Sequence, residues 1–459
     1  MGSLNTSLFI GLQGLEASQA ALNATSNNIS NSNTPGYTRE VPQLSANAEA
    51  DVNGSYVGGG VTLDGIQSVR DELLNLQIQQ QTSQQSSVDT QSSSLNTIQS
   101  LFSNTGIDLA SSLTAFSSSL QQLSANPSSS AVQQAVIAAG QNLAKSFNST
   151  ASGLASAQTS ADQEVTQTVA QINSLSGQIA TLNAQIGQTV PSGQDGGTLQ
   201  DQRDELVQQL SQLTSVSVTQ STDGEVITTG AGTPLVMGAQ SFSLQTTTGT
   251  DGMQQVLDSN GNNITASLTG GQIGGAIQVR DQTIPGYMNT LNTLASQFAT
   301  AFNSAQAMGY DSNGNAGQAF FNIPSGTTGA AAGISVALTS PSQVAISSDG
   351  SSGSNGNVAN LSAVFTNTLP SGETPANAYA GLVFQVGNDA SNATAQSTAI
   401  GQSLLQLTNQ QSSVSGVNLD EETTNLIRFQ TAYEAAARII STMQALGTVT
   451  LDMGSSQSY

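Results

Sequence analysis

Apolar side chains recur every seven residues near both ends of the chain, and this repeat is the clearest pattern in the sequence. A seven-residue spacing keeps apolar side chains on one narrow face of a helix, and such a face packs against a partner helix. The two repeats predict that the termini pair with each other or with other copies of the chain, and the spacing alone leaves both arrangements open. The residues expected at this interface are Leu8, Leu15, Leu22, Ile29, Leu419, Leu426, Phe429, Tyr433, Ile440 and Met443.

Apolar spacings of three and four residues predict further helices, and short runs rich in Val, Ile and Thr predict strands. The expected helices cover 4–29, a stretch from about 70, 88–123, 131–187, 199–213, 273–307 and 376–451, the last broken at Ser415-Gly416. The expected extended segments are 38–70, short antiparallel strands within 214–270, and two short strands at 334–338 and 344–346.

These elements predict a mainly helical α+β fold. In it, paired terminal helices and a long helical bundle rod carry an inserted, small antiparallel β domain. The expected terminal helical domain covers 1–45 and 405–459, and the helical rod domain covers 46–213 and 271–404. The expected β domain covers 214–270.

Composition excludes several classes of function. The 459 residues carry a net charge of −22 with only seven basic residues, so neither nucleic acid nor a membrane surface is an expected partner. The chain has no Cys and no His, which removes the usual zinc ligands, the thiol nucleophile and histidine as a general base. The N-terminal residues lack a basic segment followed by an apolar run, so we expect no cleaved secretory signal.

Three kinds of short motif suggest chemistry, and each has a structural interpretation that we favour. Segments that start at Asp258 and Asp311 resemble calcium-binding loops, but they lack the glycine at position six and the glutamate at position twelve, so we interpret them as turns. The glycines within 270–275 lack the lysine of a phosphate-binding loop and are interpreted as a flexible joint. The carboxylates within 201–205 and 420–422 are expected in first helical turns, where the helix dipole favours acidic residues.

A long motif follows the first predicted helix. Residues 26–39 read Ser-Asn-Asn-Ile-Ser-Asn-Ser-Asn-Thr-Pro-Gly-Tyr-Thr-Arg and resemble the N-terminal motif shared by bacterial flagellar rod, hook and hook-associated proteins. The segments 60–71, 201–207, 270–281, 313–321 and 414–433 resemble, more narrowly, the FlgK family of hook-associated proteins. The residues of the motif loop are Asn27, Asn28, Asn33, Thr34, Pro35, Gly36, Tyr37 and Arg39.

The resemblance implies a structural role rather than an enzymatic one. It implies a subunit of the bacterial flagellum that self-assembles through its terminal helices into the adaptor junction between hook and filament. The implied partners are other copies in a ring, the hook protein, the second hook-associated junction protein and an FlgN-type export chaperone. The implied location is extracellular, at the hook–filament junction, after type III export. No catalytic, metal or cofactor-binding residue is implied.

Other interpretations stay open at this stage. Another axial flagellar subunit, either the hook protein or the second junction protein, would share the terminal helices. A secreted hydrolase would use the carboxylates within 201–205 or 420–422. An adhesin would bind its target through 214–270. The last two interpretations do not account for the matched terminal repeats.

Overall fold

The computed structural model describes residues 2–52, 55–102, 108–189, 196–221 and 224–455. The chain divides into two compact units. The first unit comprises Met1–Ser83, Gln171–Leu244 and Gly401–Tyr459, and the second comprises Gln84–Ala170 and Gln245–Ile400. The boundaries of these units differ from those of the three predicted domains, whose separate roles stay a prediction.

The first unit combines the two terminal helices with small antiparallel sheets. Its elements are α1 (Gly2–Asn31), β1 (Glu40–Ala46), β2 (Ala50–Val52), β3 (Ser55–Val57), β4 (Val61–Ser68), the start of α2 (Glu72–Phe102), the end of α4 (Ser130–Thr189), α5 (Gly197–Leu213), β5 (Val216–Ser221), β6 (Gly224–Thr229), β7 (Pro234–Met237), β8 (Gln240–Ser241), the end of α10 (Pro375–Ser415) and α11 (Leu419–Ser455). Strand β1 pairs with β4, β2 pairs with β3, and β5 to β8 form a sheet in sequence order.

The second unit contains the larger parts of α2, α4 and α10 together with shorter elements. These are α3 (Leu109–Ala125), β9 (Gln245–Thr248), β10 (Gln254–Leu257), α6 (Gly271–Gln278), a π-helical turn (Val279–Thr283), α7 (Ile284–Ala307), β11 (Phe321–Asn322), α8 (Ala330–Gly333), β12 (Ser335–Val336) and α9 (Val358–Ala363). Strand β9 pairs with β10, and β11 pairs with β12.

Phenylalanines dominate one end of the core of the second unit. The ring of Phe116 on α3 is fully buried and lies 5.0 Å from the ring of Phe302 on α7 and 5.4 Å from that of Phe320, measured between centroids. Phe298, Phe321 and Phe365 complete the cluster. Aromatic residues make up only 4% of the chain, and six of its twelve phenylalanines meet at this point.

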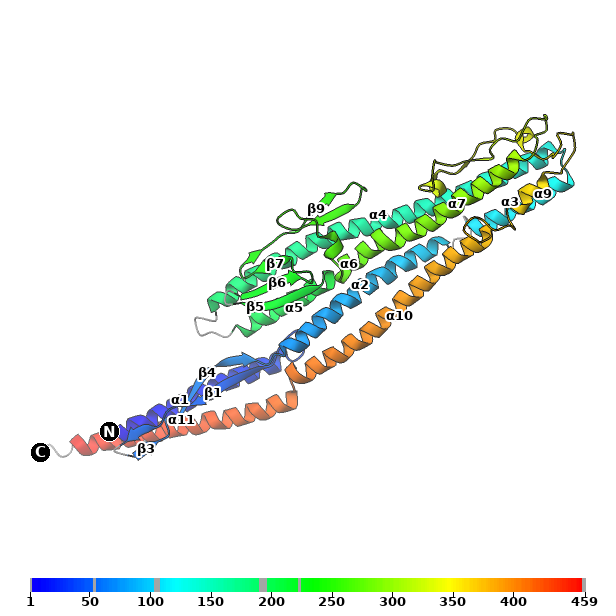
Figure 1. The fold of residues 1–459 in the computed structure, drawn as a ribbon. Helices are drawn as coiled ribbons and strands as arrows, with labels where there is room; N and C mark the ends of the chain where they lie inside the picture. Colours follow the sequence, from blue (N-terminus) through cyan, green and yellow to red (C-terminus); the bar gives the residue numbers. More distant parts are fainter. Residues whose placement is uncertain (1, 53–54, 103–107, 190–195, 222–223, 456–459) are drawn as a thin grey trace. The chain divides into compact units, whose positions relative to one another are not determined.

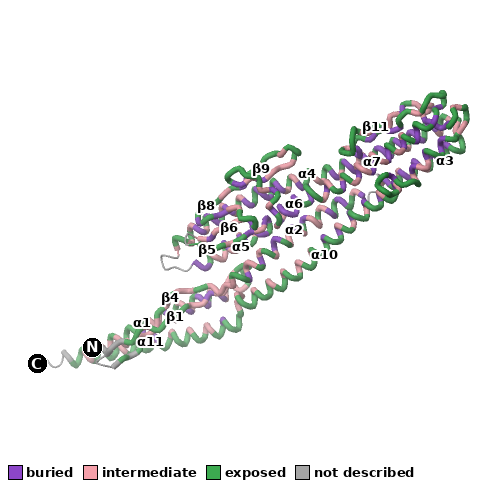
Figure 2. The backbone as a smooth tube through the Cα atoms, in the orientation of Figure 1, coloured by how far each residue is buried: buried purple, intermediate pink, exposed green. Residues whose placement is uncertain are grey.

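Helices α1 and α11 of the first unit lie side by side and antiparallel, with the start of α1 and the end of α11 together (Figure 1). The strands β1 and β4 pack against α1. Most of α11 is exposed along its length (Figure 2). The terminal pair is therefore covered on some faces and open on others.

Local chemistry sets the break between α10 and α11, as the sequence predicted at Ser415-Gly416. A Cβ atom at Gly416 would collide with the carbonyl oxygen of Ser412, so only glycine fits at this point. The Asn418 side chain then accepts hydrogen bonds from the backbone amides of Asp420 and Glu421 and caps α11. The acidic residues Asp420, Glu421 and Glu422 occupy the first turn of α11, as predicted.

Two predicted elements are wrong. The helix expected at 88–123 is two helices, because α2 ends at Phe102 and the Asp108 carboxylate caps the start of α3 by accepting from the amides of Ala110 and Ser111. The strand expected at 344–346 is absent from the described residues there, which follow a short 3-10 turn at Pro341–Gln343. Buried apolar side chains produced that pattern without strand pairing, and the strand expected at 334–338 reduces to Ser335–Val336.

Candidate assembly site

Small residues on α1 form the seam with α11. A Cβ atom at Gly11 would lie 3.2 Å from Cγ1 of Ile440, and one at Gly14 would lie 3.9 Å from Cβ of Ala436. The two backbones therefore approach closely, which larger side chains on α1 would prevent. The buried face of α1 continues through alanines that are at most 3% exposed, namely Ala17, Ala21 and Ala24.

The structure places the predicted interface residues at and beside this seam. On α11, the half-buried residues share the face of Ala436 at alternating spacings of three and four residues. They are Leu426, Phe429, Tyr433, Ile440 and Met443. On α1, Leu15, Leu22 and Ile29 are half-buried, whereas Leu8 is 36% exposed, and Leu419 at the start of α11 is 51% exposed. Their role in assembly stays a prediction.

The side chain of Asn28 connects α1, the motif loop, β1 and α11. Its Nδ2 donates to the backbone oxygen of Glu40 at 2.9 Å and to the Glu422 carboxylate at 3.1 Å. Its Oδ1 accepts from the Tyr37 hydroxyl at 2.8 Å and from the Glu40 amide at 2.9 Å. Asn28 is 1% exposed and Glu422 is 3% exposed. We call Asn28, Tyr37, Glu40 and Glu422 the Asn28 clasp.

Other residues of the motif loop tie the same elements together. Asn27 Nδ2 donates to the Glu40 carboxylate at 3.0 Å. Arg39 forms an ion pair of 3.0 Å with Glu421 on α11, and its backbone amide donates to the carbonyl oxygen of Ser415 at the end of α10. The motif loop therefore holds the start of α11 against the end of α1.

The turn itself depends on residues with special backbone properties. The Thr34 hydroxyl and amide both donate to Asn31, which closes the turn after α1. Gly36 has a φ of +76°, a left-handed conformation that glycine adopts without strain. Pro35 lines a cleft beside the loop, and Asn33 is exposed. The sequence-based prediction of a turn at Pro35-Gly36 is confirmed.

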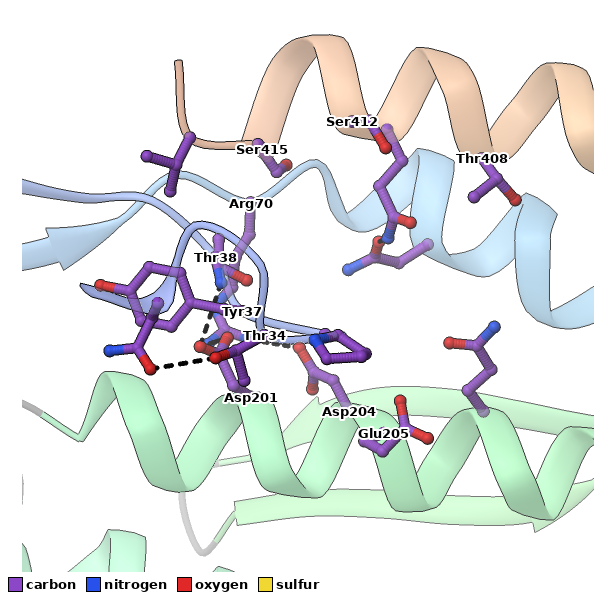
Figure 3. A pocket seen from close by; sticks show the side chains of 18 of the residues that line it. Thr34, Tyr37, Thr38, Arg70, Asp201, Asp204, Glu205, Thr408, Ser412 and Ser415 are labelled. Atoms are coloured by element: carbon purple, nitrogen blue, oxygen red, sulfur yellow. Dashed lines mark hydrogen bonds and ion pairs between the residues drawn. The ribbon is translucent and has the colours of Figure 1, made fainter. Parts of the chain in front are cut away.

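Helix α5 forms one wall of this cleft (Figure 3). The backbone amide of Thr38 donates to Asp201 at 3.1 Å, and Arg70 forms ion pairs with Asp201 at 2.6 Å and with Asp204. Helix α5 begins at Gly197, so these carboxylates lie beyond its first turn and the prediction from the helix dipole is wrong for them. Their partner is the half-buried Arg70 rather than the helix terminus.

A second ion pair joins α5 to β6. Arg203 is 7% exposed and contacts the Glu225 carboxylate on β6 at 2.6 Å. Burial raises the pKa of Asp204 above its ordinary value, although Arg70 and Arg203 oppose this. Burial likewise raises the pKa of Glu225, opposed by Arg203. Arginines contact both carboxylates, so these ion pairs tie α5 to its neighbours.

The loops that resemble calcium sites are turns, as predicted. The Asp258 carboxylate accepts from the amides of Asn260 and Asn262, and Asp311 does the same with Asn313 and Asn315. Each carboxylate therefore organises its own loop.

The glycines within 270–275 are not a flexible joint, because all but Gly270 lie within α6. A Cβ atom at Gly275 would collide with the carbonyl oxygen of Ser87 on α2, and one at Gly274 would collide with the backbone of Thr269. Close packing of α6 against α2 therefore requires glycine at these positions, which corrects the sequence-based interpretation.

The Asp258 turn predicts a specific pH response. Hydrogen bonds from the side chain and backbone of Asn262 lower the pKa of Asp258. A lowered pKa means that the charged carboxylate stabilises the loop above the ordinary pKa of an aspartate, and that this contribution is lost as the pH falls through the lowered value. Asn262→Ala is expected to raise the pKa of Asp258 toward its ordinary value, as followed by NMR titration of the carboxyl carbon.

The matched control for this titration is Asn260→Ala, because Asn260 contributes only its backbone amide to the turn. An Asp258 pKa that is the same in Asn262→Ala as in the parent chain would contradict the prediction.

Sequence reasoning missed Glu40 and Arg70, which are central to the clasp and the cleft. Their partners are distant in sequence, so no local pattern marks them. One signal was present: the chain has only seven basic residues. Among the described residues, Arg39, Arg70, Arg203 and Arg280 all form ion pairs, so a search for acidic partners of each arginine would have been informative.

Known protein families match three stretches of the chain. Residues 95–321 match the helical domain of the flagellar hook-associated protein FlgK. Residues 8–38 match the flagella basal body rod protein family, and residues 409–451 match the C-terminal region of the flagellar basal body rod FlgEFG proteins. The latter two stretches cover most of α1 and α11. The fold and the terminal pair therefore define an axial protein of the bacterial flagellum.

Whole-length relatives narrow this class. Flagellar hook-associated protein 1 of Bacillus subtilis is 30% identical over 495 residues, covering 96% of this chain and 97% of that protein. The proteins of the same name from Salmonella typhimurium and Escherichia coli K12 are each 29% identical, covering 95% of this chain and 97% of their own length. The chain belongs to the FlgK family of flagellar hook-associated proteins.

A solved structure supports the fold. The flagellar hook junction protein FlgK from Burkholderia pseudomallei superposes with a TM-score of 0.66 at 20% identity, covering 74% of this chain and all of that one. The prediction of a mainly helical α+β fold is confirmed. The chain is a structural component of the flagellum, not an enzyme, and it assembles with other flagellar components. No helix within the described ranges combines the length and hydropathy needed to cross a bilayer.

Proposed function

We propose that this chain forms the adaptor ring between the flagellar hook and filament, and that copies assemble through α1 and α11. One observation carries the proposal: the terminal pair is fastened by the buried Asn28 clasp yet exposes large apolar side chains. Phe9 is 58% exposed, Ile439 47% and Leu446 46%. Apolar residues gathered on an exposed surface mark sites of protein interaction.

The proposed arrangement assigns a layer to each predicted domain. The terminal helical domain, 1–45 with 405–459, forms the inner tube. The helical rod domain, 46–213 with 271–404, forms the next shell, and 214–270 faces outward. The exposed apolar side chains of α11 and the exposed polar side chains of β5 support this order.

The proposed partners follow from the same site. Other copies of the chain, the hook protein and the second hook-associated junction protein would contact the terminal helices in the flagellum. Before export, an FlgN-type chaperone would cover α11, whose apolar residues are the most exposed in the terminal pair. Export through the flagellar type III system would deliver the chain to the cell exterior. A chain without cysteine needs no disulfide to refold there.

Electron microscopy of cells that lack the protein tests the proposal. Hooks without filaments, with flagellin released into the medium, are the expected result. Complementation with Leu426→Asp is expected to fail, because this half-buried residue lies on the α11 face that packs against α1. Gln430→Asp, at an exposed position on the same helix, is the matched control and should restore filaments. Filaments of normal number in the deletion strain, or in Leu426→Asp cells, would overturn the proposal.

A further inference from the structure

Helix α11 carries a second, mostly apolar stripe that α1 touches at Ile439 and otherwise leaves exposed. Its members follow one another at alternating spacings of three and four residues, which is the spacing of a coiled-coil face. We call this the outer stripe, and it consists of Ala432, Ala435, Ile439, Thr442, Leu446, Val449 and Met453. Every member is exposed, Val449 by 53% and Met453 by 59%. A single helix thus presents two coiled-coil faces, of which one is occupied.

The outer stripe begins inside a groove. The groove has a volume of about 760 Å³ and lies between α1, α11 and the β1–β4 hairpin. Its lining is mostly apolar, and Arg428 and Ser18 are its polar members. Gly14 of α1 and Ala432 and Ala435 of α11 contribute only small side chains to it, and Phe429 and Ile439 border it. Small residues leave room for bulky side chains from outside. The groove is continuous with the α1–α11 seam, since Gly11, Gly14 and Ala436 belong to both.

Helix α1 carries bulky side chains that suit such a groove. Leu8, Leu12 and Leu15 follow one another at spacings of four and three residues, and we call them the leucine seam. Leu8 is 36% exposed and Leu12 is 45% exposed. Leu12 follows Gly11 and Leu15 follows Gly14, and both glycines line the groove. One residue is a rotation of about 100° around a helix, so each leucine lies on a different face of α1 from the glycine before it. The leucine seam and the groove are therefore different surfaces of the chain.

The charge pattern favours contact between these two surfaces. Residues 1–15 contain no charged residue, and neither do residues 439–451. Docking of the leucine seam along residues 439–451 therefore buries apolar side chains of a segment that carries no charge.

We propose that the leucine seam of one copy docks into the groove and along the outer stripe of α11 of the next copy. The contact joins two different surfaces, so each copy offers one of each, and successive copies build a closed ring or a helical array. This inference rests on the proposed function, because it names the surfaces by which copies of the chain assemble.

Complementation between two defective variants tests the inference in the purified full-length chain. Ammonium sulfate strengthens apolar burial and is used to drive association, which is followed by sedimentation velocity. Leu12→Asp damages the leucine seam, and Leu446→Asp damages the outer stripe. Each variant alone is expected to associate about 10- to 100-fold more weakly than the parent chain, given the burial free energy of one leucine. Ser441→Asp, exposed on another face of α11, is the control and should associate normally.

The decisive sample is an equimolar mixture of the two variants. Each still has one intact surface of the complementary kind, so the mixture is expected to form pairs that do not grow further. A mixture that associates as weakly as either variant alone would overturn the inference. It would show that the outer stripe contacts the outer stripe of another copy, or a different protein. Association of both variants at the parent level, or none in the parent chain itself, would also overturn it. Circular dichroism of each variant checks that helical content is retained.

Cells separate this inference from the proposed function. If Leu12→Asp and Leu446→Asp restore filaments while Leu426→Asp does not, the docking surfaces are wrong and assembly through the terminal pair stands. If Leu426→Asp also restores filaments, the proposed function itself fails. Because the chain has no native cysteine, Leu12→Cys can also be paired with Ile439→Cys, Thr442→Cys or Leu446→Cys in a second copy. A disulfide between chains at one of these positions gives the register of the contact.

Discussion

Asn28→Ala is expected to release α11 from the end of α1 and to abolish incorporation into flagella. In this variant the Glu422 carboxylate and the Glu40 carbonyl oxygen each lose a hydrogen-bond donor. The Tyr37 hydroxyl and the Glu40 amide each lose their acceptor. Each buried polar group that loses a partner costs about 1–3 kcal/mol. Because these losses fall on one site and do not add fully, we expect the opening free energy of the terminal pair to fall by about 3–5 kcal/mol.

Amide hydrogen exchange across α1 and α11 measures this loss, and swimming in soft agar measures its consequence. Asn23→Ala is the matched control, since Asn23 is exposed on the same helix. Asn28→Asp adds a sharper comparison, because it keeps the shape of the side chain but replaces its donors with acceptors beside Glu422. Exchange in α11 that is as slow in Asn28→Ala as in the parent chain would show that the clasp does not hold the helix.

The sequence predicted the terminal helices well because their signal is local and long. The repeat placed the first helix at 4–29, and α1 covers Gly2–Asn31. The loop after it was recognisable from its turn-forming residues, and Gly36 has the positive φ expected there. Helices whose apolar pattern extends over several turns are the elements that a single sequence predicts best.

The interior of the terminal site was not predictable in the same way. Asn28 and Glu422 are separated by 394 positions, so only the folded chain brings them together. The small residues of the seam between α1 and α11 escaped the sequence for a different reason. Large apolar residues dominate a hydrophobic pattern, whereas the closest helix approach uses Gly11, Ala17 and Ala21. The leucines that were most visible in the sequence lie beside the seam, and this left them available for other contacts.

The carboxylates of α5 illustrate how one boundary changes an interpretation. An expected helix start at 199 placed Asp201 in the first turn, where the dipole accounts for an acidic residue. The helix begins at Gly197, and Arg70, 131 positions away from Asp201, is the partner. Helix ends are the least certain part of any sequence-based prediction. Explanations that depend on a first turn carry that uncertainty with them.

Phe116→Ala is expected to lower the free energy of unfolding of the second unit by about 3–5 kcal/mol, the usual cost of removing a fully buried phenylalanine. The side chain is completely buried, and its ring contacts those of Phe298, Phe302, Phe320, Phe321 and Phe365. These rings come from α3, α7 and the segments that follow α7 and α9, so the cavity would loosen several elements at once. Urea unfolding, monitored by amide exchange, measures the change in each unit separately.

The control for this substitution is Phe384→Ala, because Phe384 belongs to the same unit and is 74% exposed. It should change the free energy of unfolding by less than about 0.5 kcal/mol. The comparison also tests how assembly is organised. Phe116 lies outside the terminal pair, so Phe116→Ala should leave the amide protection of α1 and α11 unchanged, in contrast to Asn28→Ala. Loss of protection in the terminal helices of Phe116→Ala would mean that the pair depends on the second unit for its folding, and that assembly cannot be assigned to the first unit alone.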